Sequence, residues 1–173
     1  MSFVSPLQLL DWCKIPYQDL VTYPERKVSF RLCADSAEMG RMMARELVDE
    51  ILAHNARGEP MRAIIPCGPS CWYQPFTDLV NRERVSLRHL VVFHMDECLD
   101  WQGRELPRCH PYNFRGFMEE QFYAPVDSAL AVPDANRVWL NGRNIEEVRE
   151  RIWAAPIDLT YGCLLYTSPS PRD

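Results

Sequence analysis

A short apolar run that ends in two adjacent carboxylates is the feature that most limits how this chain can fold. Residues 90–93 are apolar and include two β-branched valines, and the run passes through His94 and Met95 directly into Asp96 and Glu97. The run has no helical period and predicts a buried strand of a parallel sheet. In open α/β sheets ligands bind beyond the carboxyl ends of such strands, where Asp96 and Glu97 would lie.

Two chemical roles are open to this acidic pair. A carboxylate at a partly desolvated strand end can have a raised pKa and can transfer a proton to or from a substrate. Asp96 and Glu97 could instead cap a loop or form a salt bridge, and their spacing alone favours that plain structural role.

The rest of the chain alternates predicted strands with predicted helices. Strands are expected at 28–33, 63–65, 90–95, 137–140 and 157–161. Helices are expected at 5–13, from a cap at Asp35 to Gly58, after the loop that ends at Cys71, at 111–123 and at 145–153. In the second helix, Met39, Met43, Leu47 and Ile51 recur every four residues and predict the buried face. The alternation predicts an α/β fold with a Rossmann-like, doubly wound, mostly parallel sheet.

A glycine-containing loop, residues 66–71, connects the strand at 63–65 to the following helix. Unpaired backbone N–H groups and the helix dipole converge at such a junction, which makes it a candidate anion site. One glycine, Gly68, and one serine, Ser70, make the signal weak in isolation, and an ordinary strand-to-helix turn is the alternative.

Composition narrows the classes of protein that the chain can belong to. Its 173 residues suffice for one α/β domain, and its net charge of −5 does not favour nucleic acid or an anionic membrane as a partner. No apolar run is long enough to span a bilayer, and the first residues do not resemble a secretory signal. Seven cysteines in such a chain are expected to be reduced thiols, so we expect a cytoplasmic protein.

The last residues, 163–173, are unlike the rest of the chain. They spell C-L-L-Y-T-S-P-S-P-R-D, which matches, codon by codon, one reading frame of the transposon-end adapter used in sequencing libraries. We therefore expect 163–173 to be a non-native tail and 1–162 to be the N-terminal part of a single α/β domain, with its sheet incomplete at the C-terminus. A natural Ser/Pro-rich terminus is the alternative.

Several segments carry a family resemblance when they are taken together. Residues 65–71 spell I-P-C-G-P-S-C, residues 93–98 spell F-H-M-D-E-C, and His110-Pro111 precedes a predicted helix. In this order they resemble L-P-T-G-S-T-P, F-x-M-D-E-Y and the His-Pro of the glucosamine-6-phosphate deaminase/isomerase family. Residues 158–162, D-L-T-Y-G, resemble the strand that leads to the family's G-x-G-x-x-G-H-x-A-F-N-E-P segment. The resemblance runs from about Val28 to Gly162, and M-D-E is its most specific element.

The chain departs from the family pattern at several positions. Cys67, Pro69 and Cys71 replace residues that are usual in the phosphate loop, and Pro69 removes one backbone donor. Cys98 replaces the usual aromatic residue, and Asn113 replaces a usual serine. These changes indicate a divergent branch, in which the reaction type is better defined than the sugar phosphate.

The resemblance implies an enzyme of amino-sugar metabolism. It implies conversion of glucosamine 6-phosphate to fructose 6-phosphate and ammonia, with removal of the proton α to a carbonyl. Asp96 matches the family's catalytic base, Glu97 a supporting residue, and Cys67, Gly68 and Ser70 the phosphate loop. No cofactor and no metal are implied. The partner is a small sugar phosphate, and a homo-oligomer is open for the full-length protein. The family's ring-opening residues and phosphate-binding lysine would follow Gly162, so the 173-residue chain is expected to be inactive.

Three other functions stay open at this point. A 6-phosphogluconolactonase shares this fold and a phosphate loop, although M-D-E argues against it. A non-catalytic sugar-phosphate sensor could use the same fold, and an intact G-H-x-A-F-N-E-P segment would argue for catalysis instead. A zinc site is the third alternative, although its spacings fit no common zinc pattern well; its candidate ligands are Cys67, Cys71, His94, Cys98, Cys109 and His110.

Overall fold

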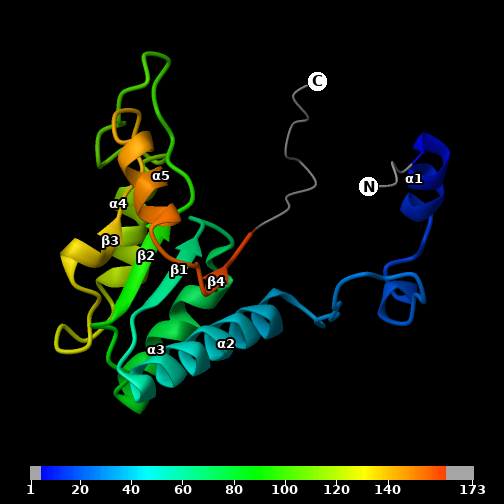
Figure 1. Cartoon of the computed structure of the whole chain (residues 1–173), viewed down its shortest axis with the longest axis horizontal. Helices are drawn as coiled ribbons and strands as arrows, with labels where there is room; N and C mark the ends of the chain where they lie inside the picture. The colour runs from blue at the N-terminus through cyan, green and yellow to red at the C-terminus, as the bar shows by residue number, and fades with distance from the viewer. Residues whose placement is uncertain (1–4, 163–173) are drawn as a thin grey trace. The chain divides into compact units, whose positions relative to one another are not determined.

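The computed structural model describes residues 5–162 of the chain (Figure 1). The chain divides into two compact units, Met1–Asp35 and Ser36–Asp173.

The first unit contains short helices and irregular backbone. Helix α1 (Pro6–Cys13) confirms the expected N-terminal helix, with the Ser5 side chain accepting a 3.2 Å hydrogen bond from the Gln8 N–H. A 3-10 turn, η1, follows at Asp19–Val21. The strand expected at 28–33 is wrong, because this segment joins none of the strands in the described part of the chain. Alternation can specify two faces, but a strand also needs a neighbouring backbone to pair with.

The second unit is built on a four-stranded sheet in which every pairing is parallel. Its strands are β1 (Met61–Ile65), β2 (Leu90–His94), β3 (Arg137–Val138) and β4 (Leu159–Thr160), in the order β3-β2-β1-β4. Residue Ile65 at the end of β1 is in register with His94 at the end of β2. The loops that leave these two strands therefore start side by side.

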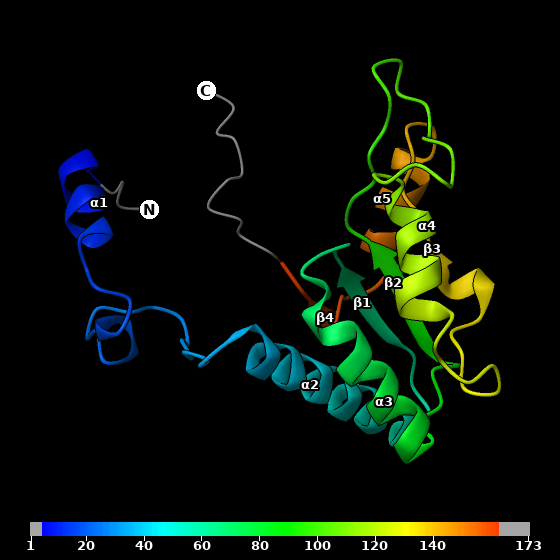
Figure 2. The same cartoon turned by 180° about the vertical axis from the view of Figure 1, so that it is seen from behind.

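Helices cover both faces of this sheet. On one face α2 (Ser36–Arg57), α3 (Tyr73–Glu83) and the π-helical turn η3 (Glu119–Tyr123) contribute to the larger core, together with Met118 at the end of α4 (Phe114–Met118). On the other face α5 (Ile145–Trp153) packs Val148 against Phe93 and Val138. Figures 1 and 2 show α5 on the opposite face from α3 and α4. The expected Rossmann-like α/β fold is confirmed.

The long helix α2 buries a face slightly rotated from the expected one. Leu47 and Ile51 are buried as predicted, whereas Met43 is only partly buried. Gly40, Ala44, Val48 and His54 complete the buried stripe. Small residues lie where the helix approaches its neighbours closely, which spacing of large apolar residues alone does not reveal.

The remaining elements are short. The 3-10 turn η2 (Ser70–Trp72) leads into α3, and η4 (Asp134–Asn136) leads into β3. Within residues 5–162, none of the helices is long and apolar enough to cross a membrane.

Candidate active site

The acidic pair and the glycine loop meet at the carboxyl ends of β1 and β2. The Met95 N–H donates to the carbonyl of Ile65 at 3.0 Å, which extends the ladder one residue beyond the strands. The Cys67 N–H then donates to Asp96 Oδ1, also at 3.0 Å. Asp96 and the loop are 29 residues apart in sequence, yet a single hydrogen bond joins them. The structure thus brings together two segments that the sequence predicted separately.

The glycine loop itself has the features of an anion cradle. Pro69 is the residue before η2 and Trp72 is the residue before α3. Neither residue makes a side-chain hydrogen bond that caps the helix start. Ser70 is exposed, and space around Gly68 is open, since no atom lies within 4 Å of where its Cβ would be. Uncapped N–H groups at the start of a helix favour a negatively charged ligand. The Cys67 N–H is already engaged by Asp96, so Gly68 and Ser70 are the better candidates for donors to a phosphate.

The Cys67 side chain is not suited to nucleophilic chemistry. Burial raises the pKa of its thiol to about 12, and the nearby carboxylates of Asp96 and Glu97 add to the shift. A thiol with this pKa stays protonated at neutral pH, and the thiolate is the reactive form.

Two further residues, which the sequence did not indicate as part of the site, contact the backbone of the loop. The Tyr73 hydroxyl donates toward the Pro66 carbonyl at 3.3 Å and lies 2.9 Å from the Met118 sulfur. Burial raises the pKa of Tyr73 well above its ordinary value, so the hydroxyl keeps its proton. Gly40 of α2 lies so close that a Cβ there would be 2.2 Å from the Cys71 carbonyl oxygen. Neither residue carries a sequence signal beyond a place on an apolar helix face.

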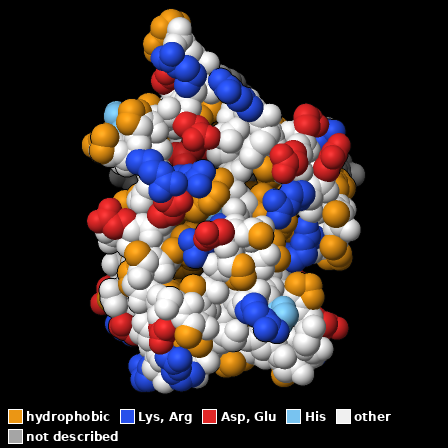
Figure 3. Space-filling view, turned by 90° about the vertical axis from the view of Figure 1, so that its left-hand side faces the viewer, with side chains coloured by type: hydrophobic (Ala, Val, Ile, Leu, Met, Phe, Trp, Pro, Cys, Tyr) orange, Lys and Arg blue, Asp and Glu red, His pale blue; other side chains and the backbone are white. Residues whose placement is uncertain are grey.

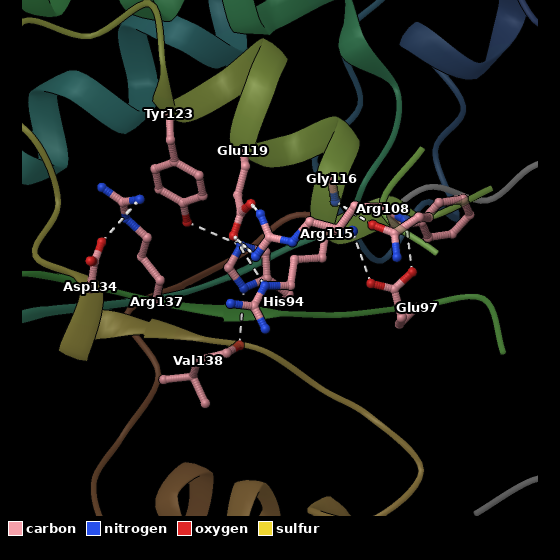
Figure 4. A network of polar contacts seen from close by, with 12 residues as sticks. His94, Glu97, Arg108, Arg115, Gly116, Glu119, Tyr123, Asp134, Arg137 and Val138 are labelled. Carbon is pink, nitrogen blue, oxygen red and sulfur yellow. Dashed lines mark hydrogen bonds and ion pairs between the residues drawn. The ribbon is translucent and has the colours of Figure 1, made fainter. Parts of the chain in front are cut away.

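Glu97 holds the start of α4. Its carboxylate accepts a hydrogen bond from the backbone N–H of Arg115 at 2.8 Å (Figure 4). It also accepts from the backbone N–H groups of Phe114 at 2.7 Å and of its own neighbour Cys98 at 3.0 Å. Asn113 adds the usual side-chain cap by accepting from the Gly116 N–H at 2.6 Å. Together they fasten both ends of the long loop between β2 and α4.

Charged side chains around this edge of the sheet are largely paired. Arg104 binds Asp100 at 2.8 Å, and both Arg108 and Arg115 bind Glu119. Figure 3 shows Lys/Arg and Asp/Glu side chains interleaved on the face it presents. A phosphate near Ser70 would therefore depend on backbone donors more than on these arginines.

The six candidate zinc ligands do not assemble into a metal centre in the described residues. No group of three or more His, Cys, Asp or Glu side chains there could hold a metal ion. Both ring nitrogens of His94 are hydrogen-bonded, one to Val138 and one to Tyr123.

A hollow of about 440 Å³ lies between α2 and α3 and does not include Asp96. Leu79, Pro75 and Ala37 supply much of its apolar lining, and Arg41, Arg45 and Arg82 are also on its wall. Arg45 is bound by Glu83 and Asp49, and Arg82 also binds Glu83. Two of the three arginines of the hollow are thus paired with carboxylates, and Cys71, at the end of the glycine loop, also lines it.

Comparison with known proteins finds glucosamine-6-phosphate deaminases among the relatives of this chain. A glucosamine-6-phosphate deaminase of Serratia proteamaculans (strain 568) is 32% identical over 111 residues, which are 62% of this chain and 38% of that protein. The solved structure of a monomeric glucosamine-6-phosphate deaminase, called a missing link of the NagB superfamily, matches with a TM-score of 0.54 at 19% identity. That match covers 69% of this chain and 46% of the solved one. No protein-family model matches the chain.

The chain spans less than half the length of both the curated relative and the solved structure. The structural match supports the fold, and the sequence match supports the family. The predicted resemblance of this chain to the glucosamine-6-phosphate deaminase/isomerase family is therefore confirmed.

Proposed function

We propose that this chain supplies the proton-abstracting part of an enzyme that converts glucosamine 6-phosphate to fructose 6-phosphate and ammonia. The observation that carries the proposal is the hydrogen bond between the Cys67 N–H and Asp96 Oδ1. It joins the most specific motif to the candidate phosphate loop at neighbouring strand ends. The curated relative is a glucosamine-6-phosphate deaminase, which supplies the substrate class.

In this proposal each residue has a separate role. Asp96 removes the C2 proton of the opened sugar, using the carboxylate oxygen that the Cys67 N–H does not bind. Gly68 and Ser70 bind the phosphate through backbone N–H groups and a hydroxyl. Cys67 orients Asp96 through its backbone, and Glu97 supports the site by holding α4. Ring opening is assigned to residues outside the matched segments.

The test replaces Asp96 by Asn in the full-length protein. The amide keeps the size of the side chain and can still accept from the Cys67 N–H, but it is not a base. We expect exchange of the C2 proton with deuterated solvent to be abolished, while binding of the sugar phosphate stays within about twofold. NMR of the substrate measures the exchange, and calorimetry measures the binding. Normal exchange in a folded Asp96→Asn protein would exclude Asp96 as the base.

The same assay separates the proposal from a sugar-phosphate sensor. A sensor would bind glucosamine 6-phosphate without exchanging its C2 proton or releasing ammonia, even with Asp96 intact. Binding without exchange in the unmutated full-length protein would therefore reject the enzymatic proposal.

A further inference from the structure

His94 lies two residues before Asp96 and is one of the few buried polar side chains of the described core. It is 5% exposed and ends strand β2. Its Nδ1 is 3.0 Å from the Val138 carbonyl, and its Nε2 is 3.0 Å from the Tyr123 hydroxyl (Figure 4). A carbonyl can only accept, so Nδ1 carries the hydrogen and Nε2 accepts from Tyr123. Both ends of the imidazole are thus satisfied in one tautomer.

The imidazole continues the sheet where the backbone ladder stops. Pairing of β2 with β3 ends at Phe93 and Val138. The His94 side chain then binds the Val138 carbonyl, while the next backbone N–H, that of Met95, binds Ile65 on β1. The ring also stacks on Trp139, with centroids 3.5 Å apart and planes 12° from parallel. The backbone just before Asp96 is therefore held from both neighbouring strands.

The segment from α4 through η3 is held at both ends by residues that flank Asp96. Glu97 binds the N–H groups of Phe114 and Arg115 at its start. His94 binds the hydroxyl of Tyr123 at its end. Asp96 lies between these two anchors in sequence, so both of its flanks are attached to the same helical segment.

We propose that His94 is a positioning residue for Asp96: it fixes the end of β2 so that the carboxylate stays on the Cys67 N–H with its second oxygen free. The proposal rests on the proposed function of Asp96 as the base. His94 itself does not touch the substrate. Burial lowers the pKa of His94 to about 4, so at neutral pH the ring stays uncharged and keeps the tautomer that both partners require.

The test compares His94→Phe with Tyr123→Phe in the full-length protein. The first variant keeps a ring against Trp139 but removes both hydrogen bonds, and the second removes only the Tyr123 hydroxyl. Leu130→Ala is the control, because Leu130 is buried and its carbonyl binds the Leu87 N–H before β2 begins, away from the strand's carboxyl end. It lowers stability without touching the anchors of Asp96.

Two readouts are taken on each variant. Amide hydrogen exchange at Cys67, relative to Ala63 and Val92 in the strands, reports whether Asp96 still occupies the loop N–H. We expect this relative exchange to rise at least tenfold in His94→Phe, less in Tyr123→Phe, and not in Leu130→Ala. We expect kcat to fall by roughly tenfold to a hundredfold in His94→Phe, with KM within about twofold, because a slightly misplaced base slows chemistry more than binding.

Specific results would overturn the proposal. Unchanged relative exchange at Cys67 in His94→Phe would contradict it. Equal increases in relative exchange in His94→Phe and Leu130→Ala would also contradict it, because His94 would then act as an ordinary core residue. If His94→Phe does not fold, Tyr123→Phe decides by the same criteria. If the unmutated protein shows no deaminase turnover, the proposed function is rejected, and the exchange at Cys67 alone decides the positioning role.

Discussion

At the scale of single residues, one donor of the candidate site is used within the protein, whereas a neighbouring donor is left for a ligand. The Cys67 N–H is used internally by Asp96. The Ser70 hydroxyl, by contrast, is exposed and has no partner among residues 5–162. A donor left free beside an uncapped helix start is suited to a phosphate oxygen.

Replacing Ser70 by Ala tests this division. We expect sugar-phosphate binding to weaken by about 1–3 kcal/mol, the range for losing a hydrogen bond to a charged group. Thermal stability should be almost unchanged, because the hydroxyl binds nothing in the described residues of the free protein. Calorimetry with glucosamine 6-phosphate measures the affinity, and Ser128→Ala, an exposed serine between η3 and β3, is the matched control. Equal affinity in the two variants would remove Ser70 from the phosphate site.

At the scale of elements, the short helix α4 depends on a residue far from it in sequence. It has only five residues, and such a helix is marginal without tertiary support. Glu97 provides that support by satisfying two of its first N–H groups. Glu97 therefore has the capping role that the sequence allowed for the acidic pair, and the proton-transfer role is the one proposed for Asp96.

Substitution of Glu97 by Gln should separate capping from chemistry. The amide has one acceptor oxygen instead of two and no charge, so we expect a loss of about 1–3 kcal/mol in the free energy of unfolding. Amide exchange at Phe114 and Arg115 should accelerate, whereas C2-proton exchange per folded molecule should persist, unlike in Asp96→Asn. Urea denaturation and NMR make these measurements. The control is Glu120→Gln, an exposed carboxylate on the same helical segment, in which a comparable loss would argue against the cap.

At the scale of the whole molecule, the buried His94 links stability to pH. The ordinary pKa of this side chain is 6.5, and burial lowers it to about 4 in the folded protein. The unfolded chain therefore binds the proton first as pH falls, so stability that is present above pH 6.5 is lost progressively down to about pH 4. The full effect is about 3 kcal/mol at 1.36 kcal/mol for each unit of pKa.

Urea denaturation across this pH range tests the linkage. The slope of unfolding free energy against pH between about 6.5 and 4 should be smaller in His94→Phe than in the unmutated protein, because the titrating group is gone. The comparison removes contributions from the other histidines, which both proteins share. Identical slopes would show that His94 does not titrate in the expected way.

The activity of the 173-residue chain is a second test at this scale. The chain spans 38% of its curated relative, and the proposal assigns ring opening to residues outside the matched segments. We expect this chain to release no ammonia from glucosamine 6-phosphate, whereas the full-length protein should do so. An ammonia assay on both proteins checks this, and turnover by the 173-residue chain would overturn the division of roles.

Local patterns determined much of this protein from the sequence alone. The apolar run before Asp96 specified β2, the apolar faces specified α2 and α3, and the expected range 145–153 coincides with α5. These predictions succeed because periodicity, capping and turn chemistry act over a few residues. The M-D-E motif likewise indicated the family, because its three residues are consecutive in the sequence.

Only the tertiary structure decided which strands pair and which distant side chains form hydrogen bonds. The alternating segment 28–33 has no strand partner in the described chain, whereas β3 and β4 exist through two paired residues each. The contacts of Asp96 with Cys67, of Glu97 with α4 and of His94 with Tyr123 span 29, 17–18 and 29 residues. Such hydrogen bonds arise when packing closes long loops, and the free energy of that closure depends on the whole core rather than on any local pattern.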